Sequence, residues 1–104
     1  SNSLVNKLEE EKTISSPSNF SLSQNYPNPF NPSTTISFSL AEADVVSLKV
    51  YDVLGREVAT VVNEYLSAGN YSQIFNAAGL ASGQYVYRLQ CGKYSETKKM
   101  ILLK

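Results

Sequence analysis

From Phe20 to the end of the chain, apolar and polar residues alternate in short runs that are separated by turn-forming residues. The clearest run is ISFSL at residues 36–40, where serines separate three apolar side chains. Successive side chains of a β-strand point to opposite faces, so this alternation is typical of strands that bury one face. The strands predicted in this way cover residues 20–24, 36–40, 46–52, 56–62, 70–76, 85–91 and 94–103.

Turn signals separate these predicted strands. Gly55 is suited to a tight turn between the third and fourth strands, and Gly92-Lys93 to a two-residue turn before the last one. Residues 77–83 form a longer crossing connection. This pattern predicts an all-β fold, a seven-stranded antiparallel immunoglobulin-like β-sandwich with Greek-key connections. The side chains expected to face inward are Leu22, Ile36, Phe38, Leu40, Leu48, Val50, Val58, Phe75, Tyr85, Tyr87, Leu89, Ile101 and Leu103.

A tyrosine stands at the start of the sixth predicted strand, just after a glycine. The sequence LASGQY places Leu80, Gly83 and Tyr85 where Greek-key sandwiches have a tyrosine corner, in which the hydroxyl bonds to backbone a few residues upstream. The alternative is an ordinary tyrosine packed in a strand. We therefore expect a corner at Tyr85.

Two segments lack the alternation. Residues 25–32 (NYPNPFNP) are here called the Asn-Pro segment. Their three prolines indicate a rigid loop rather than a strand that is hydrogen-bonded to a neighbour. Residues 1–19 are polar and charged, so we interpret them as an expression scar followed by an interdomain linker, with one turn of helix around Leu8. The folded domain is then residues 20–104, behind a larger cargo domain.

The composition of the chain argues against several kinds of activity. The chain has no histidine, one cysteine and carboxylates that are scattered singly, so we expect no enzyme activity, no metal site, no cofactor and no small-molecule substrate. Its 9 basic and 9 acidic residues give zero net charge, which argues against nucleic acid as a partner. Cys91 lies in a strand-like run and is expected to be a small buried residue.

The C-terminal part of the chain is nevertheless basic. From Arg88 to the end, the chain contains five basic residues and one acidic residue, Glu96, and the last strand has the sequence TKKMILLK. Lysines on an edge strand protect a sheet against aggregation, which is one explanation. The other is a recognition element, because an edge strand can be captured by strand addition. Both explanations remain open at this point.

Four motifs carry a resemblance to a known family. They are QNYPNPFNPST at residues 24–34, VYDVLGREV at 50–58, LASGQYVYRL at 80–89 and KKMILLK at 98–104. In this order they resemble the type A C-terminal sorting domain of the type IX (Por) secretion system, over the whole folded part. The one departure is Gln73, where an apolar strand residue is expected.

The resemblance implies a function. Such domains direct a cargo protein from the periplasm across the outer membrane to the cell surface or the extracellular space. The implied partners are components of the type IX translocon, a sortase-like peptidase that removes the domain, and the cargo domain of the same chain. The residues at the positions most associated with the signal are Gly83, Tyr85, Gly92, Lys98 and Lys99, to which we add the basic last residue, Lys104.

Two other functions compete. An adhesive or carbohydrate-binding module of a surface hydrolase needs exposed aromatic rings, which Tyr26, Phe30, Tyr65 and Tyr94 would have to supply in the absence of tryptophan. A structural spacer would lie in the middle of a protein. The absence of tryptophan argues against the first function, and a stop codon directly after Lys104 in the full-length gene would favour sorting over the second.

Overall fold

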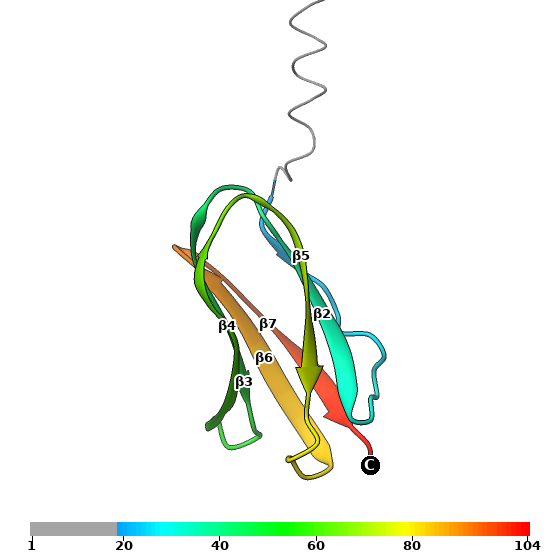
Figure 1. Cartoon of the computed structure of the whole chain (residues 1–104). Coiled ribbons are helices and arrows are strands. Elements are labelled where there is room, and N and C mark those ends of the chain that lie inside the picture. Colours follow the sequence, from blue (N-terminus) through cyan, green and yellow to red (C-terminus); the bar gives the residue numbers. More distant parts are fainter. Residues whose placement is uncertain (1–18) are drawn as a thin grey trace, which may run out of the picture.

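The computed structural model describes residues 19–104, and these residues form seven antiparallel strands in two sheets (Figure 1). The strands are β1 (Ser21–Leu22), β2 (Ser33–Leu40), β3 (Asp44–Tyr51), β4 (Glu57–Leu66), β5 (Gly69–Asn76), β6 (Gly83–Cys91) and β7 (Tyr94–Leu102). The predicted immunoglobulin-like sandwich is confirmed. The helical turn expected around Leu8 lies outside the described residues, and the linker stays a prediction.

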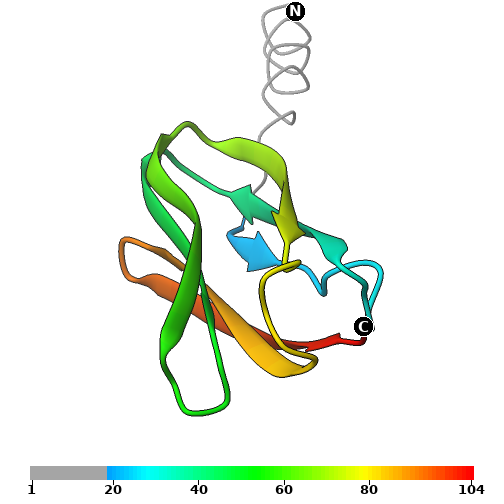
Figure 2. The same cartoon turned by 60° about the horizontal axis from the view of Figure 1, so that its bottom comes forward.

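The order of the strands shows how the chain crosses between the layers. One sheet has the order β1-β2-β5 and the other has the order β4-β3-β6-β7. The chain forms the β3–β4 hairpin, returns to the first sheet with β5 and then crosses again to place β6 beside β3, which is the Greek-key path (Figure 2). Among residues 19–104, no helix is long and apolar enough to cross a membrane.

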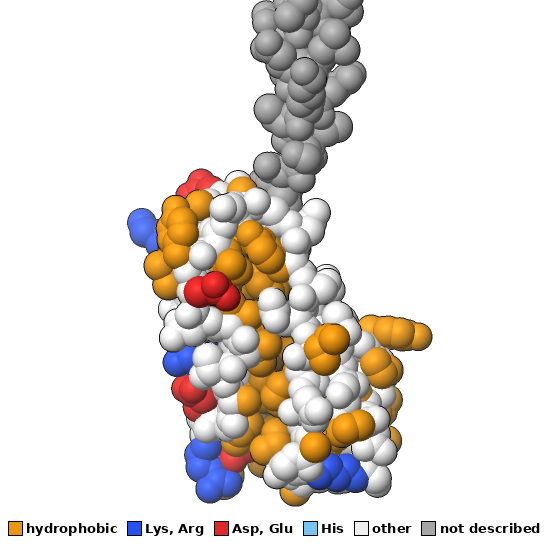
Figure 3. Space-filling view, viewed as in Figure 1, with side chains coloured by type: hydrophobic (Ala, Val, Ile, Leu, Met, Phe, Trp, Pro, Cys, Tyr) orange, Lys and Arg blue, Asp and Glu red, His pale blue; other side chains and the backbone are white. Residues whose placement is uncertain are grey.

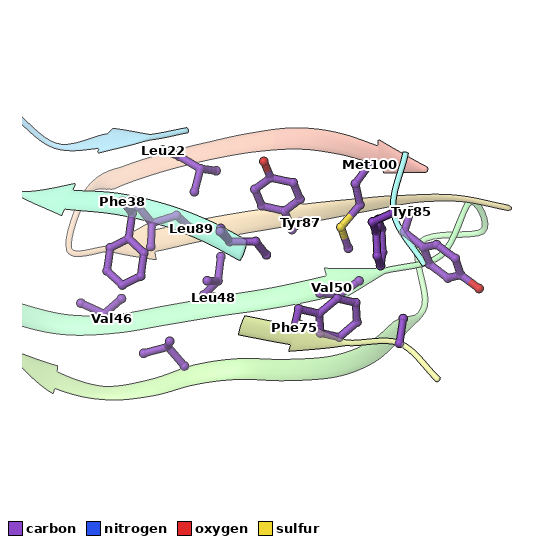
Figure 4. Close-up of a cluster of buried hydrophobic side chains, with 14 of the residues drawn as sticks. Leu22, Phe38, Val46, Leu48, Val50, Phe75, Tyr85, Tyr87, Leu89 and Met100 are labelled. Atoms are coloured by element: carbon purple, nitrogen blue, oxygen red, sulfur yellow. The ribbon is translucent and has the colours of Figure 1, made fainter. Parts of the chain in front are cut away.

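The core lies between the two sheets and is filled by the residues that alternate along them (Figure 4). The side chains predicted to face inward in the first six strands are buried, except Val58, which is only partly buried at the margin of the core. Cys91 is buried, as predicted. The prediction missed Phe30, Val46, Val62, Ala77, Met100 and Leu102, which are buried as well.

The inward assignment of Ile101 and Leu103 is wrong. Ile101 is 41% exposed and Leu103 55% exposed, whereas Met100 and Leu102 are fully buried. The two-residue turn pairs Cys91 with Tyr94, so every inward residue of β6 faces an even-numbered residue of β7. A shift of one residue moves all side chains of a strand to the other face.

The two long sides of the sandwich differ. On one side β4 and β5 end their sheets, and Figure 3 shows hydrophobic side chains in a band between the sheets there. Gln73 lies on the inner face of β5 at this side and is half-buried, which leaves its amide within reach of water. On the other side, β1 and the Asn-Pro segment lie along β7.

Candidate recognition surface

The four motifs, which are far apart in the sequence, meet at one end of the sandwich. This end, here called the motif end, consists of the Asn-Pro segment, the β3–β4 turn (residues 52–56), the β5–β6 connection (residues 77–82) and the last two residues. Figure 1 and Figure 2 both place the C-terminal residue beside the Asn-Pro segment. The β3–β4 turn and the start of β6 together line an open cleft.

Lys104 ties the last residues to the β5–β6 connection. Its backbone N–H donates to Ser82 Oγ at 3.0 Å, and its ammonium group donates to the carbonyl of Ala78 at 2.7 Å. The ammonium group, predicted to be a recognition element, thus already has a partner within the domain.

The β3–β4 turn is held by polar groups and presents apolar ones. The Asp52 carboxylate accepts the N–H groups of Leu54 and Arg56, and the Arg56 guanidinium lies 2.8 Å from it. These bonds, the Arg56 N–H first, hold the pKa of Asp52 below its usual value. Val53 and Leu54 are left 72% and 73% exposed at the tip. Because the turn is fixed, two aliphatic side chains stand in a defined position beside the cleft.

The tyrosine corner at Tyr85 is confirmed. The Tyr85 hydroxyl donates to the carbonyl of Ala81 at 2.6 Å, and the ring is buried. Gly83 begins β6 with φ at +152°, where other residues are strained, and it lines the cleft. Gly83 and Tyr85 therefore shape the motif end through the backbone rather than through an exposed side chain.

A second corner escaped the sequence analysis. The Tyr71 hydroxyl donates to the carbonyl of Ser67 at 2.6 Å, and Gly69 stands two residues before the tyrosine, as Gly83 does before Tyr85. The repeated Gly-x-Tyr spacing was the available signal.

Gly92 lies at the opposite end of the sandwich, in the turn between β6 and β7. Its φ is +59°, and the Asp44 carboxylate packs over the position that a side chain would take. The structure therefore does not bring Gly92 together with Gly83, Tyr85 and Lys104. Its geometry is that of a turn glycine.

The adjacent lysines of β7 point to opposite faces. Lys98 faces inward at the margin of the sheet and forms an ion pair of 3.5 Å with Glu96. The pKa of Glu96 is lowered by the hydrogen bond from the Tyr94 hydroxyl, then by Lys98 and the Leu22 N–H. The pKa of Tyr94 is raised by burial and by its hydrogen bond to Glu96. Lys99 is exposed on the outer face. The two ammonium groups therefore lie on opposite sides of the sheet, and a partner would have to approach each of them from a different side.

The edge of β7 is partly covered by the chain itself. Phe30 donates to the carbonyl of Ile101 at 2.9 Å and accepts the Leu103 N–H at 3.0 Å. The Ile101 N–H donates to the Asn28 side chain at 2.9 Å, and the Gln24 amide donates to the carbonyl of Lys99 at 2.7 Å. Strand addition along residues 99–103 would therefore require Gln24 and the Asn-Pro segment to leave.

A buried polar network anchors the start of the Asn-Pro segment. The Tyr87 hydroxyl donates to the carbonyl of Ser23 and accepts the Asn25 N–H, at 2.7 and 2.8 Å. The Asn25 amide in turn donates to the Thr34 hydroxyl and to the carbonyl of Pro27. Burial raises the pKa of Tyr87 to about 12, so its hydroxyl stays protonated near neutral pH. The sequence pattern does not indicate this network, because it identifies Tyr87 only as an inward strand residue.

The described part of the chain does not gather metal ligands: residues 19–104 contain no group of three acidic, histidine or cysteine side chains that could hold an ion. Burial, and then the charge of Asp44, raise the pKa of the Cys91 thiol, which keeps it protonated near neutral pH.

The aromatic residues do not form a sugar-binding platform. Phe30 is buried, and Tyr94 stacks on Phe20 at 5.3 Å. Tyr26 and Tyr65 are exposed, but Tyr26 bridges to β2 and Tyr65 lies on β4 in the other sheet. A carbohydrate-binding role thus has no support from the arrangement of these rings.

Comparison with known protein families identifies a match over most of the chain. The family model described as "Secretion system C-terminal sorting domain" matches residues 24–103. No curated protein and no solved structure matches the chain.

Proposed function

The chain belongs to the family of secretion system C-terminal sorting domains, and we propose that the export machinery recognises it through the motif end. As a member, it is a C-terminal sorting signal for type IX secretion, which implies export to the cell surface or the extracellular space. Such a signal acts on an upstream cargo. The four family motifs cover residues that meet at one end, and this convergence is the observation that carries the proposal.

The candidate residues take different roles in this proposal. Gly83 and Tyr85 shape the cleft, Lys104 closes the β5–β6 connection, and Gly92 serves the opposite turn. Val53 and Leu54 offer the apolar contact that recognition by a protein surface favours. Of the adjacent lysines, Lys99 is the better placed to meet a partner, because its side chain is exposed and forms no ion pair within residues 19–104.

The finer steps are part of the same proposal. Translocon components bind the folded domain, and a sortase-like peptidase removes it from the cargo after export. The domain supplies recognition, while the chemistry lies with the partners. The absence of histidine and the single, buried cysteine support a non-catalytic role.

A reporter export assay tests the proposal. Residues 20–104 are fused behind a periplasm-targeted fluorescent protein in a host with a type IX system. We expect the reporter at the surface or in the medium. The motif-end double variant V53S/L54S should remain folded, because both side chains are exposed, and should be retained in the periplasm. The matched control is Val45→Ser, an exposed valine at the opposite end of β3.

The outcomes separate two levels of the proposal. If the intact fusion stays in the periplasm, the assignment as a sorting signal for this system fails. If it is exported and V53S/L54S is exported equally well, recognition does not use the motif end. Deletion of residues 98–104 is a poor test, because it removes Met100 and Leu102 from the core.

The two lysines are tested separately. Reversal of both charges in K98E/K99E should cause retention of a folded reporter, and Lys99→Glu alone should cause most of it. Lys98→Glu alone should act chiefly by repelling Glu96 within the domain. Export of the folded double variant at the wild-type level would leave protection of the sheet edge as the role of these lysines.

A further inference from the structure

The outer face of the four-stranded sheet carries three cationic side chains from three neighbouring strands. Lys49 of β3 lies directly opposite Arg88 of β6, and Lys99 of β7 lies opposite Val86, two residues before Arg88. Their inward neighbours Val50, Tyr87 and Met100 are fully buried, which fixes all three cations on the outer face. We call Lys49, Arg88 and Lys99 the cationic row. Neighbouring strands are about 5 Å apart and Lys99 is displaced from the Lys49–Arg88 line by two residues, about 7 Å along β7, so the cationic row is staggered and spans about 12 Å.

The pairing of Lys49 with Arg88 breaks a rule of sheet construction. Like charges directly opposite each other on neighbouring strands are unfavourable. The protein compensates only in part, because Glu57 lies 3.3 Å from the Lys49 ammonium group and the Arg88 guanidinium lies over the Tyr51 ring at 5.2 Å. Within residues 19–104, no carboxylate forms an ion pair with Arg88 or Lys99. Among the described residues, the row therefore keeps two positive charges without an ion-pair partner on the outer face.

We propose that the cationic row is a second contact surface, which binds an acidic, extended segment of a protein of the export machinery. The inference rests on the sorting function, and it adds a surface that lies outside the motif end. Charge complementarity identifies the occupant. In an extended segment, alternate side chains are about 7 Å apart on one face, so three carboxylates at every second position extend over about 14 Å and can reach all three cations.

The surroundings of the row favour a polypeptide over a membrane. Anionic lipid surfaces are typically bound by clusters of about 4–8 basic residues, whereas this row has three and the chain has zero net charge. Thr97 lies opposite Arg88 in the same cross-strand line, and its hydroxyl can hydrogen-bond to a carboxylate or to a backbone. On the other side of Lys49, the Thr60 hydroxyl already donates to Glu57. Tyr51 and Val86 add apolar surface in the neighbouring line.

Titration with a defined peptide tests the surface. The probe is an acetylated and amidated TETETET peptide, and its control has glutamine in place of glutamate. We expect the glutamate peptide to shift the backbone amide NMR signals of the cationic row in the 104-residue chain. The variant K49Q/R88Q should bind about tenfold more weakly, whereas Lys93→Gln, in the distant β6–β7 turn, should bind within about twofold of wild type. Raised salt should weaken binding, because it shortens the range of the interaction.

Several outcomes overturn the inference. Equal binding of the glutamine peptide, or signal changes confined to other residues, would show that the row does not select carboxylates. Tighter association of the chain with anionic phospholipid vesicles than with the peptide, lost in K49Q/R88Q, would assign the row to a membrane instead. A thermal unfolding midpoint equal to that of wild type verifies that K49Q/R88Q is folded. The single variant Lys99→Gln, expected to weaken binding several-fold, gives an independent reading.

The reporter assay separates this inference from the proposed function. Lys49 and Arg88 lie outside the motif end, so K49Q/R88Q tests the row alone. Export of the intact fusion with retention of this variant supports the second surface. Export of both to the same extent overturns it and leaves the sorting function standing. Failure of the intact fusion to be exported removes the sorting function, whatever the peptide experiment gives.

Discussion

The two tyrosine corners stand at opposite ends of the sandwich and share one local geometry. Gly69 and Gly83 begin β5 and β6 with φ at +153° and +152°. The tyrosines two residues later, Tyr71 and Tyr85, each donate a hydrogen bond of 2.6 Å to the carbonyl four residues upstream. Even their strand partners correspond, because each glycine faces a buried leucine on the neighbouring strand, Leu40 or Leu102.

The difference between the corners lies in what surrounds them. Tyr85 is 7% exposed and lies beside the cleft, the β3–β4 turn and the chain end. Tyr71 is half-buried and stacks on Phe38 at the other end. Since the same corner occurs at both ends, the corner is a way of starting a strand and does not by itself mark a recognition site. The neighbours of Tyr85 give the motif end its distinct surface.

The largest effect is expected from the leucines that lie opposite the corner glycines. Leu40→Ala and Leu102→Ala each remove a fully buried side chain and should each lower the free energy of unfolding by about 2–5 kcal/mol. Urea denaturation measures both. The control, Ile101→Ala, truncates a side chain that is 41% exposed and should cost less than about 1 kcal/mol. A larger loss for Ile101→Ala than for Leu102→Ala would contradict the register of β7.

The register of β7 shows how much of the fold could be predicted from the sequence. The alternation in residues 36–40 and 85–91 predicted the inward faces correctly, because polar residues mark the outer face there at every position except Val86. The run MILL at residues 100–103 contains no polar residue, so its pattern is the same for either face. The turn at Gly92-Lys93 nevertheless implied that even-numbered residues of β7 face inward, given the odd-numbered ones of β6. The prediction of the faces was inconsistent with the prediction of the turn.

The candidate surface was less predictable than the fold. The Gly-x-Tyr spacing was enough to predict the bond of Tyr85, and it would have been enough for Tyr71. In contrast, the bonds of Asn28 and Gln24 to β7 join residues more than 70 positions apart. Such side chain to backbone bonds follow no period, so no pattern in one sequence reveals them. The same holds for the opposite directions of Lys98 and Lys99, which depend on the register.

The second comparison concerns the corner glycines. Gly69→Ala and Gly83→Ala should each cost about 1–3 kcal/mol, because φ near +152° strains a residue that has a Cβ atom. A Cβ at Gly83 would meet no atom within 4 Å, and one at Gly69 would make ordinary contact with the Tyr71 ring. The two costs should therefore be similar and should come from the backbone. Thermal denaturation of both variants checks this, and an unchanged midpoint for either would mean that its corner tolerates other residues.

The corner hydroxyls should differ in their effect. Tyr85→Phe removes a part-buried hydrogen bond between a buried tyrosine and the Ala81 carbonyl and should cost about 1–3 kcal/mol. Tyr71→Phe should cost less than about 1 kcal/mol, because the Ser67 carbonyl can bond to water instead. Denaturation midpoints of the two variants, measured side by side, test the difference. Equal midpoints for Tyr85→Phe and wild type would mean that the Tyr85 hydroxyl adds no stability and that the residue contributes only through the packing of its ring.

The smallest effect is expected from acid, and it also distinguishes the two ends. Asp52 at the motif end and Glu96 towards the opposite end both have a pKa below the ordinary values of 3.8 and 4.5. A carboxylate with a lowered pKa in the folded state adds stability above its ordinary pKa, and this contribution disappears as the pH falls through the folded value. The free energy of unfolding should therefore decline as the pH drops below about 4.5.

Carbon-detected NMR titration assigns this decline to its groups. Tyr94→Phe removes the hydroxyl that is the largest cause of the lowered pKa of Glu96, so that pKa should rise towards 4.5 while the pKa of Asp52 stays unchanged. Arg56→Gln should raise the pKa of Asp52 only part of the way, because the largest cause is the Arg56 backbone N–H, which the substitution keeps. A full return of the pKa of Asp52 to 3.8 in Arg56→Gln would mean that the guanidinium, and not the geometry of the turn, sets this carboxylate. The exposed tip of Val53 and Leu54 would then depend on an ion pair that salt can screen.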